Sequence, residues 1–286
     1  MTIPAARADQ TSAVQTQAER ARAFRALHEG PGPLLLPNPW DAGSARLLAS
    51  LGFSALATTS GGFAATLGRP DGEVTRDEAL GHAADIVAAT PLPVSADLEN
   101  AFADEPAGVA ETIGLAAAAG LAGCSVEDFT RRPHDPIYDL GLARERVAAA
   151  ASAAKAAPGP LVLTARAENY LHGRPDLADT IRRLQAYQEA GADVLYAPGL
   201  TSLADIRAVV SSVDRPVNVL ALAGAPAVPQ LAAAGVRRIS VGSAFSNAAL
   251  GALVSSAREL REQGTYGFLD LAATGRAHTS VAFRAE

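Results

Sequence analysis

The sequence contains a single cysteine and a single lysine among its 286 residues. With only Cys124 available, the chain has no internal disulfide framework and no cysteine-based zinc cluster. We therefore expect a reducing, cytoplasmic environment. Lys155 lies in the alanine-rich stretch AAASAAKAAPG, which predicts an exposed helix surface. This placement argues against Schiff-base catalysis, because that chemistry needs a desolvated lysine inside a pocket.

Clusters of basic residues and long apolar runs are also missing. The net charge is −6, and the basic residues are scattered along the chain. This distribution argues against a nucleic-acid partner and against an anionic membrane surface. The N-terminal stretch lacks the apolar core of a signal peptide, and no apolar run approaches the ~20 residues of a membrane span. A small-molecule partner is the expectation that remains.

The composition provides ample material for a large core. Hydrophobic residues make up 49% of the chain and charged residues 19%, which is typical of a globular protein. The length exceeds that of an ordinary domain, but α/β barrels commonly reach about 250 residues as one unit. We therefore predict a single domain over residues 1–286.

Eight short β-type stretches recur along the chain, and a helical pattern follows each of them. The candidate strands lie at residues 33–38, 53–60, 91–99, 122–128, 159–168, 192–199, 215–224 and 236–243.

The connections alternate between two types. Helices that close on SLGF, AAGLAG, EAGADV or AAGVRR lead into the even-numbered strands, whereas the odd-numbered strands follow a proline. Glycine suits a helix C-terminus, and proline suits the first residue of a strand. A two-strand unit repeated four times predicts a (β/α)8 barrel of the TIM type, with a doubly wound open sheet as the alternative.

The barrel is expected to occupy residues 33–250, with additional helical segments on both sides. A helix at residues 12–30 would cover the bottom of the barrel. Residues 251–286 form a predicted C-terminal helical extension, which begins with an amphipathic pattern and ends in a weakly patterned tail. The extension exceeds what one closing helix needs, so we expect part of it to pack on another subunit.

Polar residues gather at the predicted C-terminal ends of the strands, where the chemistry of such barrels takes place. These candidates are Asn38, Asp41, Ser60, Gly61, Gly62, Asp97, Glu99, Asn100, Glu127, Asp128, Arg166, Glu168, Asn169, Tyr196, Asn218 and Ser243.

The acids among these candidates predict a divalent cation. Side chains alternate along a strand, so Asp97 and Glu99 should share one face, as should Arg166 and Glu168. Several carboxylates in one pocket repel one another unless a cation lies among them, and oxygen ligands favour Mg²⁺ or Mn²⁺ over zinc. In the alternative interpretation each acid is solvated and paired with an arginine, the candidates being Arg69, Arg131 and Arg132.

The remaining titratable residues have mostly structural interpretations. Cys124 should face the helices as a packing residue, and Asp104 should cap the next helix or lie free on the surface. Among the histidines, His134 and His172 fall in loops after the fourth and fifth strands, where a role is conceivable. The other three are His28, His82 and His278, and no histidine pair has the spacing of a zinc site.

Several segments, in their order and spacing, resemble the isocitrate lyase and phosphoenolpyruvate mutase superfamily over roughly residues 33–250. They are WDAGSARLLASLGFSALATTSGGFAATLGRPD, SADLEN, CSVED, TARAE, VNVL and ISVGSA. The resemblance implies a phosphonomutase-like enzyme that uses Mg²⁺ to bind a 2-oxo acid or its enolate. A C–C or P–C bond beside that carbon is then made or broken.

The resemblance also implies roles for individual residues. Asp97 would be the direct metal ligand, Glu99 and Glu127 would hold metal-bound waters, and Asp71 is a further metal candidate. The backbone near Ser60, Gly61 and Gly62 would receive the substrate carboxylate, with Arg166 as its charged and catalytic partner and Asn218 as an additional substrate contact. Arg166 and the metal would stabilise the enolate charge without a Schiff base.

Two departures from the family pattern concern the site. Glu99 stands where the family has a second Asp, and Asn100-Ala101 stand where it has Thr-Gly. The lyases carry a Lys-Lys-Cys-Gly-His loop after the fourth strand, whereas this chain has FTRRPHDPIYD, which does not match the mutase loop either. His134 and Tyr138 are the candidate catalytic acid-base residues of this loop.

The sequence thus predicts a Mg²⁺-dependent enzyme that acts on a small 2-oxo or 2-hydroxy carboxylic acid through an enolate. The alternatives are a carboxylate-binding barrel that has lost catalysis and an unrelated metal-dependent aldolase, the latter disfavoured by the shortage of suitable histidines. The extension and the resemblance together predict a homo-oligomer, as a tetramer that exchanges a C-terminal helix.

Overall fold

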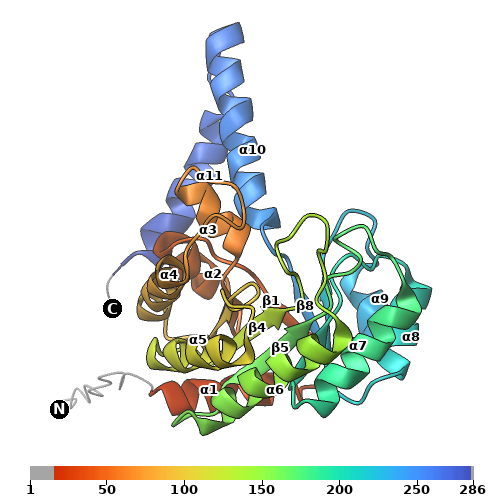
Figure 1. Cartoon of the computed structure of the whole chain (residues 1–286). Coiled ribbons are helices and arrows are strands. Elements are labelled where there is room, and N and C mark those ends of the chain that lie inside the picture. The colour runs from red at the N-terminus through yellow and green to blue at the C-terminus, as the bar shows by residue number, and fades with distance from the viewer. Residues whose placement is uncertain (1–15, 285–286) are drawn as a thin grey trace, which may run out of the picture.

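Eight parallel strands form one sheet that curls into a barrel (Figure 1) in the computed structural model, which describes residues 16–284. Each strand lies inside one of the eight predicted stretches, so these predictions are confirmed. The strands are β1 (Leu34–Leu36), β2 (Leu56–Ala57), β3 (Val94–Asp97), β4 (Gly123–Glu127), β5 (Val162–Arg166), β6 (Val194–Tyr196), β7 (Val217–Leu220) and β8 (Arg238–Ser240).

The strand order excludes the doubly wound alternative. Neighbours in the sheet follow the chain from β2 to β8, and β8 then pairs with β1. The remaining gap between β1 and β2 is bridged by one backbone hydrogen bond, in which the Ala57 amide donates to the Pro37 carbonyl at 3.1 Å. A nearly closed (β/α)8 barrel therefore brings the C-terminal ends of all eight strands to one rim.

Nine helices of the described chain, before the C-terminal segment, surround the barrel at its sides and ends. They are α1 (Gln17–Leu27), α2 (Ala42–Ser50), α3 (Ser60–Thr66), α4 (Arg76–Ala89), α5 (Pro106–Ala118), α6 (Leu140–Ala156), α7 (Leu177–Glu189), α8 (Leu203–Ser211) and α9 (Val228–Ala233). Lys155 is exposed on α6, as predicted. Cys124 is fully buried between strands and helices, and this burial raises its thiol pKa to about 12, which agrees with a packing role.

Helix α1 closes the lower end of the barrel. A capping box between Thr16 and Glu19 starts the helix. Phe24 then packs against Val162 and Val194 from the strands. Gly123 has no side chain here because a Cβ would lie 2.8 Å from the Phe24 ring. The first residues of the predicted helix, 12–15, lie outside the described part of the chain.

The C-terminal segment forms an arm that projects from the barrel (Figure 1). It consists of α10 (Ala244–Arg258), the π-helical turn η1 (Glu259–Gln263) and α11 (Leu269–Ala282), which returns to contact α2. The weakly patterned tail thus contains a regular helix, and the expected end of the barrel at residue 250 falls inside α10. Within residues 16–284, no helix is long and apolar enough to cross a bilayer.

Candidate active site

A cavity of about 240 Å³ with a mixed polar and apolar lining opens at the C-terminal rim and extends into the barrel. This volume lies below the ~300–1,000 Å³ of typical drug-sized ligand sites, so the cavity suits a small molecule. Most of its lining comes from strand ends and the loops that follow them. The polar lining residues are Asn38, Thr58, Thr59, Ser60, Asp71, Ser95, Asp97, Ser125, Arg166, Tyr196, Arg238, Ser240 and Ser243.

Arg166, the last residue of β5, is the most highly coordinated charge at the cavity. Its Nη1 lies 2.9 Å from Asp97, its Nη2 3.2 Å from Glu127, and its Nε 2.7 Å from Glu168. The guanidinium also lies 5.1 Å from the centre of the Tyr196 ring. These contacts bring together five residues that the strand-end pattern selected.

Burial and mutual repulsion dominate the electrostatics of this cluster. Burial raises the pKa of Glu127 well above its ordinary value, against the opposing charge of Arg166. Burial also raises the pKa of Glu168. Burial alone would lower the pKa of Arg166, but the surrounding carboxylates outweigh it and hold this pKa well above its usual value. Arg166 therefore remains charged and fixed in orientation.

Asp97 connects this cluster to α3. Its Oδ2 accepts a hydrogen bond from the Ser60 hydroxyl at 3.2 Å, and its Oδ1 accepts one from the Glu99 amide at 3.2 Å. Ser60 lines the cavity, whereas Gly61 and Gly62 lie behind it in the first turn of α3. A Cβ on Gly61 would lie 3.0 Å from Asp71, so glycine permits the close approach of this acid.

Glu99 does not continue the alternation of β3. The strand ends at Asp97, and Glu99 adopts a left-handed backbone conformation with φ 50°. Its carboxylate forms an ion pair with Arg131 from the loop after β4. Burial raises the pKa of Glu99 to about 7, and Arg131 opposes that shift while Asp97 and Asp71 add to it. The expectation of a shared strand face with Asp97 is therefore wrong, although Glu99 remains close to the other acids.

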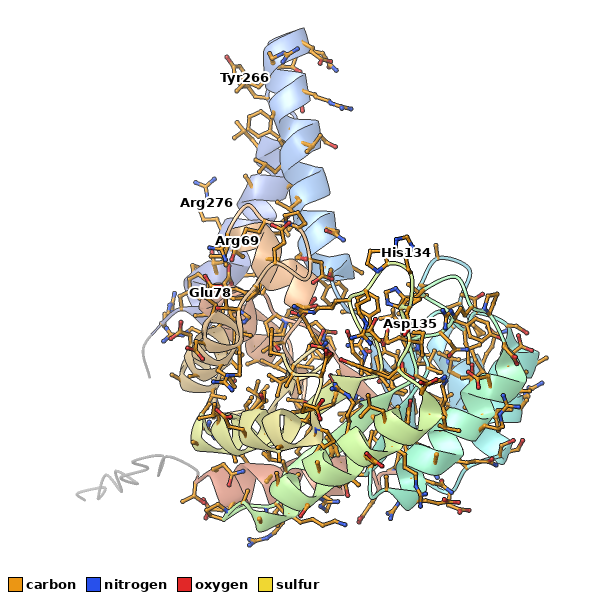
Figure 2. The ribbon with its side chains drawn as sticks, viewed as in Figure 1. Arg69, Glu78, His134, Asp135, Tyr266 and Arg276 are labelled. Atoms are coloured by element: carbon orange, nitrogen blue, oxygen red, sulfur yellow. The ribbon has the colours of Figure 1, made fainter. Side chains whose placement is uncertain are left out.

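The loop of residues 129–139 folds back on itself above the rim. Phe129 and Ile137 form an antiparallel bridge, and His172 stacks on Phe129 with ring centres 3.7 Å apart. His134 lies exposed at the tip of this loop (Figure 2). Tyr138 is buried, and burial raises its pKa to about 12. Neither of these two acid-base candidates lines the cavity.

Asp104 is exposed, as the alternative of a surface acid predicted, but it does not cap the next helix. The N-cap of α5 is Glu105, whose side chain makes no capping hydrogen bond, so the capping prediction is wrong. Asp104 instead accepts a hydrogen bond from the Tyr138 hydroxyl. It also forms an ion pair with Arg132, whose Nη1 lies 3.2 Å from its Oδ2. These contacts connect the loop after β3, which contains Asp104, to the loop after β4, which contains Arg132 and Tyr138.

Other strand-end candidates point away from the cavity and hold the scaffold. Asp128 accepts hydrogen bonds from Tyr187 at 2.5 Å and Arg183 at 3.1 Å on α7. Asn169 donates from its side-chain amide to the Thr180 hydroxyl on α7 at 2.7 Å. The others with such roles are Asp41, which caps α2, and Asn100, whose side chain accepts from the Phe102 amide. Strand-end position alone does not determine which way a side chain points once the strand has finished.

The strand-end rule missed Arg238, which lines the cavity from within the barrel. It is the first residue of β8, two positions before the strand ends, and is 4% exposed. Its Nε donates to Asn218 and its Nη1 to Thr164, both at 2.9 Å. Asn218 is thus buried as a support for Arg238 and is not part of the cavity wall. The alternation with Ser240, which lines the same cavity, was the one signal that could have revealed Arg238.

The donor set fits a hard divalent cation in its chemistry. Asp97 and Asp71 line the cavity. Burial is the main cause of the raised pKa of Glu99, and the nearby charges of Asp97 and Asp71 add to it. Between residues 16 and 284, no three His, Cys, Asp or Glu side chains form a ready-made metal cluster. Mg²⁺ does not require one, because it typically keeps several waters and uses one or two carboxylates. The residues therefore suit a metal held partly through water.

Comparisons with known proteins point to one enzyme family. Residues 24–261 match the phosphoenolpyruvate phosphomutase family. A solved structure from Burkholderia cenocepacia J2315 with a provisional lyase/mutase assignment is 56% identical, with a TM-score of 0.90 over 92% of this chain and 96% of that one. The 2-methylisocitrate lyase of Escherichia coli is 33% identical over 68% of each chain. Oxaloacetate acetylhydrolase bound to oxalate is 26% identical, with a TM-score of 0.80 over 88% of this chain and 90% of that one.

Proposed function

Because the chain belongs to the phosphoenolpyruvate phosphomutase family, within the superfamily of isocitrate lyase, we propose that it is a Mg²⁺-dependent enzyme that acts on a small carboxylic acid. The substrate would be a 2-oxo or 2-hydroxy acid, and the reaction would pass through an enolate. A C–C bond is cleaved, or a P–C bond is rearranged or hydrolysed. The observation that carries this proposal is the cluster of Arg166 with Asp97, Glu127 and Glu168 at the cavity.

The residues of the cavity supply binding and charge stabilisation. Arg166 would face the negative charge that develops on the substrate oxygen, and its carboxylate partners keep it oriented before substrate arrives. Backbone amides near Ser60, Gly61 and Gly62 would donate to the substrate carboxylate, and the Ser243 hydroxyl, which lines the same cavity, would add a further donor. Fixed donors of this kind need no reorganisation during the reaction.

A divalent metal would be held by Asp97, with Asp71, Glu99 and Glu127 acting directly or through water. When bound, Mg²⁺ supplies Lewis-acid polarisation of the substrate carbonyl, with Mn²⁺ as an alternative ion. Arg131 would keep Glu99 in place beside this metal.

Proton transfer falls to His134 or Tyr138 of the loop at residues 129–139. Because neither lines the cavity, the loop would have to shift before either residue could reach a bound acid. The same observation favours a second candidate function, a carboxylate-binding barrel without catalysis. An NMR screen of 2-hydroxy acids for pyruvate or glyoxylate release separates the two, since the second candidate binds acids but converts none.

The metal assignment is tested with oxalate, which mimics an enolate. Calorimetric titration of the wild-type protein with oxalate and Mg²⁺ should show binding that depends on the metal. Asp97→Asn should lose at least tenfold in affinity, whereas Asp104→Asn, an acid outside the cavity, should remain within twofold of wild type. Equal binding by wild type and Asp97→Asn would refute the assignment.

The arm supports a homo-oligomeric assembly, which we propose to be a tetramer with exchanged C-terminal helices. Most of the arm's apolar side chains are exposed, including Leu253 at 63%, Tyr266 at 63% and Val281 at 65%. A solvated apolar surface of this extent is typical of an interface. Leu253→Glu should shift the mass measured by light scattering from tetramer to smaller species, whereas Leu115→Glu on α5 should not. A monomeric wild-type protein would contradict the proposal.

A further inference from the structure

The interior of the barrel contains a buried cation that the proposed metal and enolate chemistry does not use. Arg238 is 4% exposed and lines the same cavity as Arg166. Within residues 16–284, it forms no ion pair, and both of its hydrogen-bond partners, Asn218 and Thr164, are neutral. An arginine that is almost fully buried normally has a carboxylate partner, because an unpaired charge is costly to desolvate.

The residues around Arg238 leave space beside it. Interior positions of such barrels are commonly filled by bulky branched side chains. Here Ser95, Ser125 and Ser240 occupy cavity-lining positions on β3, β4 and β8. Small hydroxyl side chains leave room below the rim and offer hydrogen bonds to a polar group that enters.

The charges on the two sides of this cavity are unequal. Arg166 is neutralised by three carboxylates on β3, β4 and the loop after β5, whereas Arg238 on β8 pairs with no carboxylate in the described part of the chain. Burial lowers the pKa of Arg238 to about 10, and the charge of Arg166 contributes in the same direction. The guanidinium is still protonated at neutral pH, so this end of the cavity presents one uncompensated positive charge.

We propose that Arg238 binds the second carboxylate of a dicarboxylic substrate. The inference rests on the proposed function, because the first carboxylate and the 2-oxo or 2-hydroxy group would occupy the Arg166 side. One unpaired cation matches one additional carboxylate. Nε and one Nη1 hydrogen are engaged by Asn218 and Thr164, so the guanidinium is held in a fixed orientation while its other N–H groups remain for a ligand. Arg238 thereby determines specificity for dicarboxylates over monocarboxylates.

The test compares malate with lactate, two stable 2-hydroxy acids that differ by one carboxylate. Calorimetry with Mg²⁺ should show that the wild type prefers malate. Arg238→Met should weaken malate binding about 10- to 150-fold, as expected for the loss of one charged hydrogen bond. Its lactate affinity should remain within about twofold. The neighbouring Arg237, exposed and bonded to the Gly30 carbonyl, provides the matched control Arg237→Met, which should keep the malate preference.

A second variant covers the case in which Arg238→Met does not fold. Asn218→Asp changes a neutral partner 2.9 Å from Arg238 Nε into a carboxylate of nearly the same shape. It should neutralise Arg238 internally and abolish the malate preference without removing the arginine.

The outcomes distinguish this inference from the proposed function. A wild type that binds lactate and malate equally, or an Arg238→Met variant that keeps the preference, overturns the role of Arg238 but leaves the carboxylate site intact. Equal weakening of both acids by Arg238→Met also overturns it, because the residue then acts only structurally. A wild type that binds neither acid in the presence of Mg²⁺ refutes the proposed function itself, and the inference with it.

Discussion

The two arginines that line the cavity have opposite surroundings. Arg166 lies among three carboxylates and makes an ion pair with each, whereas the side-chain partners of Arg238 among residues 16–284 are the neutral Asn218 and Thr164. The charge of Arg166 is therefore needed to hold the acidic side of the cavity together. The charge of Arg238 is not needed for neutralisation, so it remains available to a ligand.

The largest expected effect on stability comes from removing Arg166, the cation on the acidic side of the cavity. Arg166→Met leaves Asp97, Glu127 and Glu168 without their shared cation, and removal of one partner from a buried ion pair typically costs about 3–5 kcal/mol of unfolding free energy. The loss should grow as pH rises, because more of the carboxylates must then ionise. Urea unfolding at several pH values measures it.

The same substitution at Arg238 should destabilise the protein less. Arg238→Met removes an unpaired charge, so only its hydrogen bonds are lost, at about 1–2 kcal/mol. Arg69→Met, which breaks an exposed pair with Glu78, should cost less than ~1 kcal/mol. Equal destabilisation by Arg166→Met and Arg238→Met would contradict the difference between the two sides.

The pKa of His28, the C-cap residue of α1, is affected by the charge of Arg238. Burial lowers its pKa to about 4, and Arg238 and Arg25 add to this shift while Asp193 opposes it. The unfolded chain binds the proton near pH 6.5, so the unfolded state holds more protons between pH 6.5 and 4. The neutral His28 side chain therefore contributes to the free energy of unfolding above pH 6.5. This contribution, up to ~3 kcal/mol, is lost as the pH falls towards 4.

His28→Gln should remove most of this acid sensitivity. The difference in unfolding free energy between pH 7.5 and 4.5 should be smaller in this variant than in wild type, as measured by urea titration. His134→Gln, at an exposed position, serves as the control and should leave the difference unchanged. An unaltered acid response in His28→Gln would show that His28 is not the responsible group.

The smallest expected effect concerns the loop above the cavity. Tyr138→Phe removes the hydroxyl that donates to Asp104, which should cost about 0.5–1.5 kcal/mol of unfolding free energy. Oxalate binding should stay within twofold of wild type, because a bound enolate mimic requires no proton transfer. A tenfold loss of oxalate affinity would place Tyr138 in contact with the ligand and contradict its position in the structure.

The sequence predicted the barrel better than the arm, for a physical reason. Strands and helices of the barrel carry periodic apolar patterns and turn residues, so all eight strands were located from the sequence. Helix α11 buries none of its residues in this chain, so its pattern did not stand out, although it forms a regular helix. A helix that buries no side chain needs no apolar stripe, so its pattern in the sequence is weak.

The directions of the candidate side chains could be predicted where strands end and could not be predicted beyond the strand ends. Asp97 and Arg166 are the last residues of β3 and β5, so the strand itself determines their direction. Glu99 follows a left-handed turn, and Asp128 lies after the end of β4, so alternation could not place their side chains. The sequence analysis did not select Arg238, because it considered only residues at strand ends. Arg238 is the first residue of β8, and its long side chain reaches the cavity from there.

The most direct test of the central claim is a crystal structure of the protein with Mn²⁺ and oxalate, measured with anomalous scattering. The proposed function predicts an anomalous peak beside Asp97, with oxalate bound to that ion and facing Arg166. A peak elsewhere, or oxalate bound in this cavity with no metal peak beside Asp97, would contradict it.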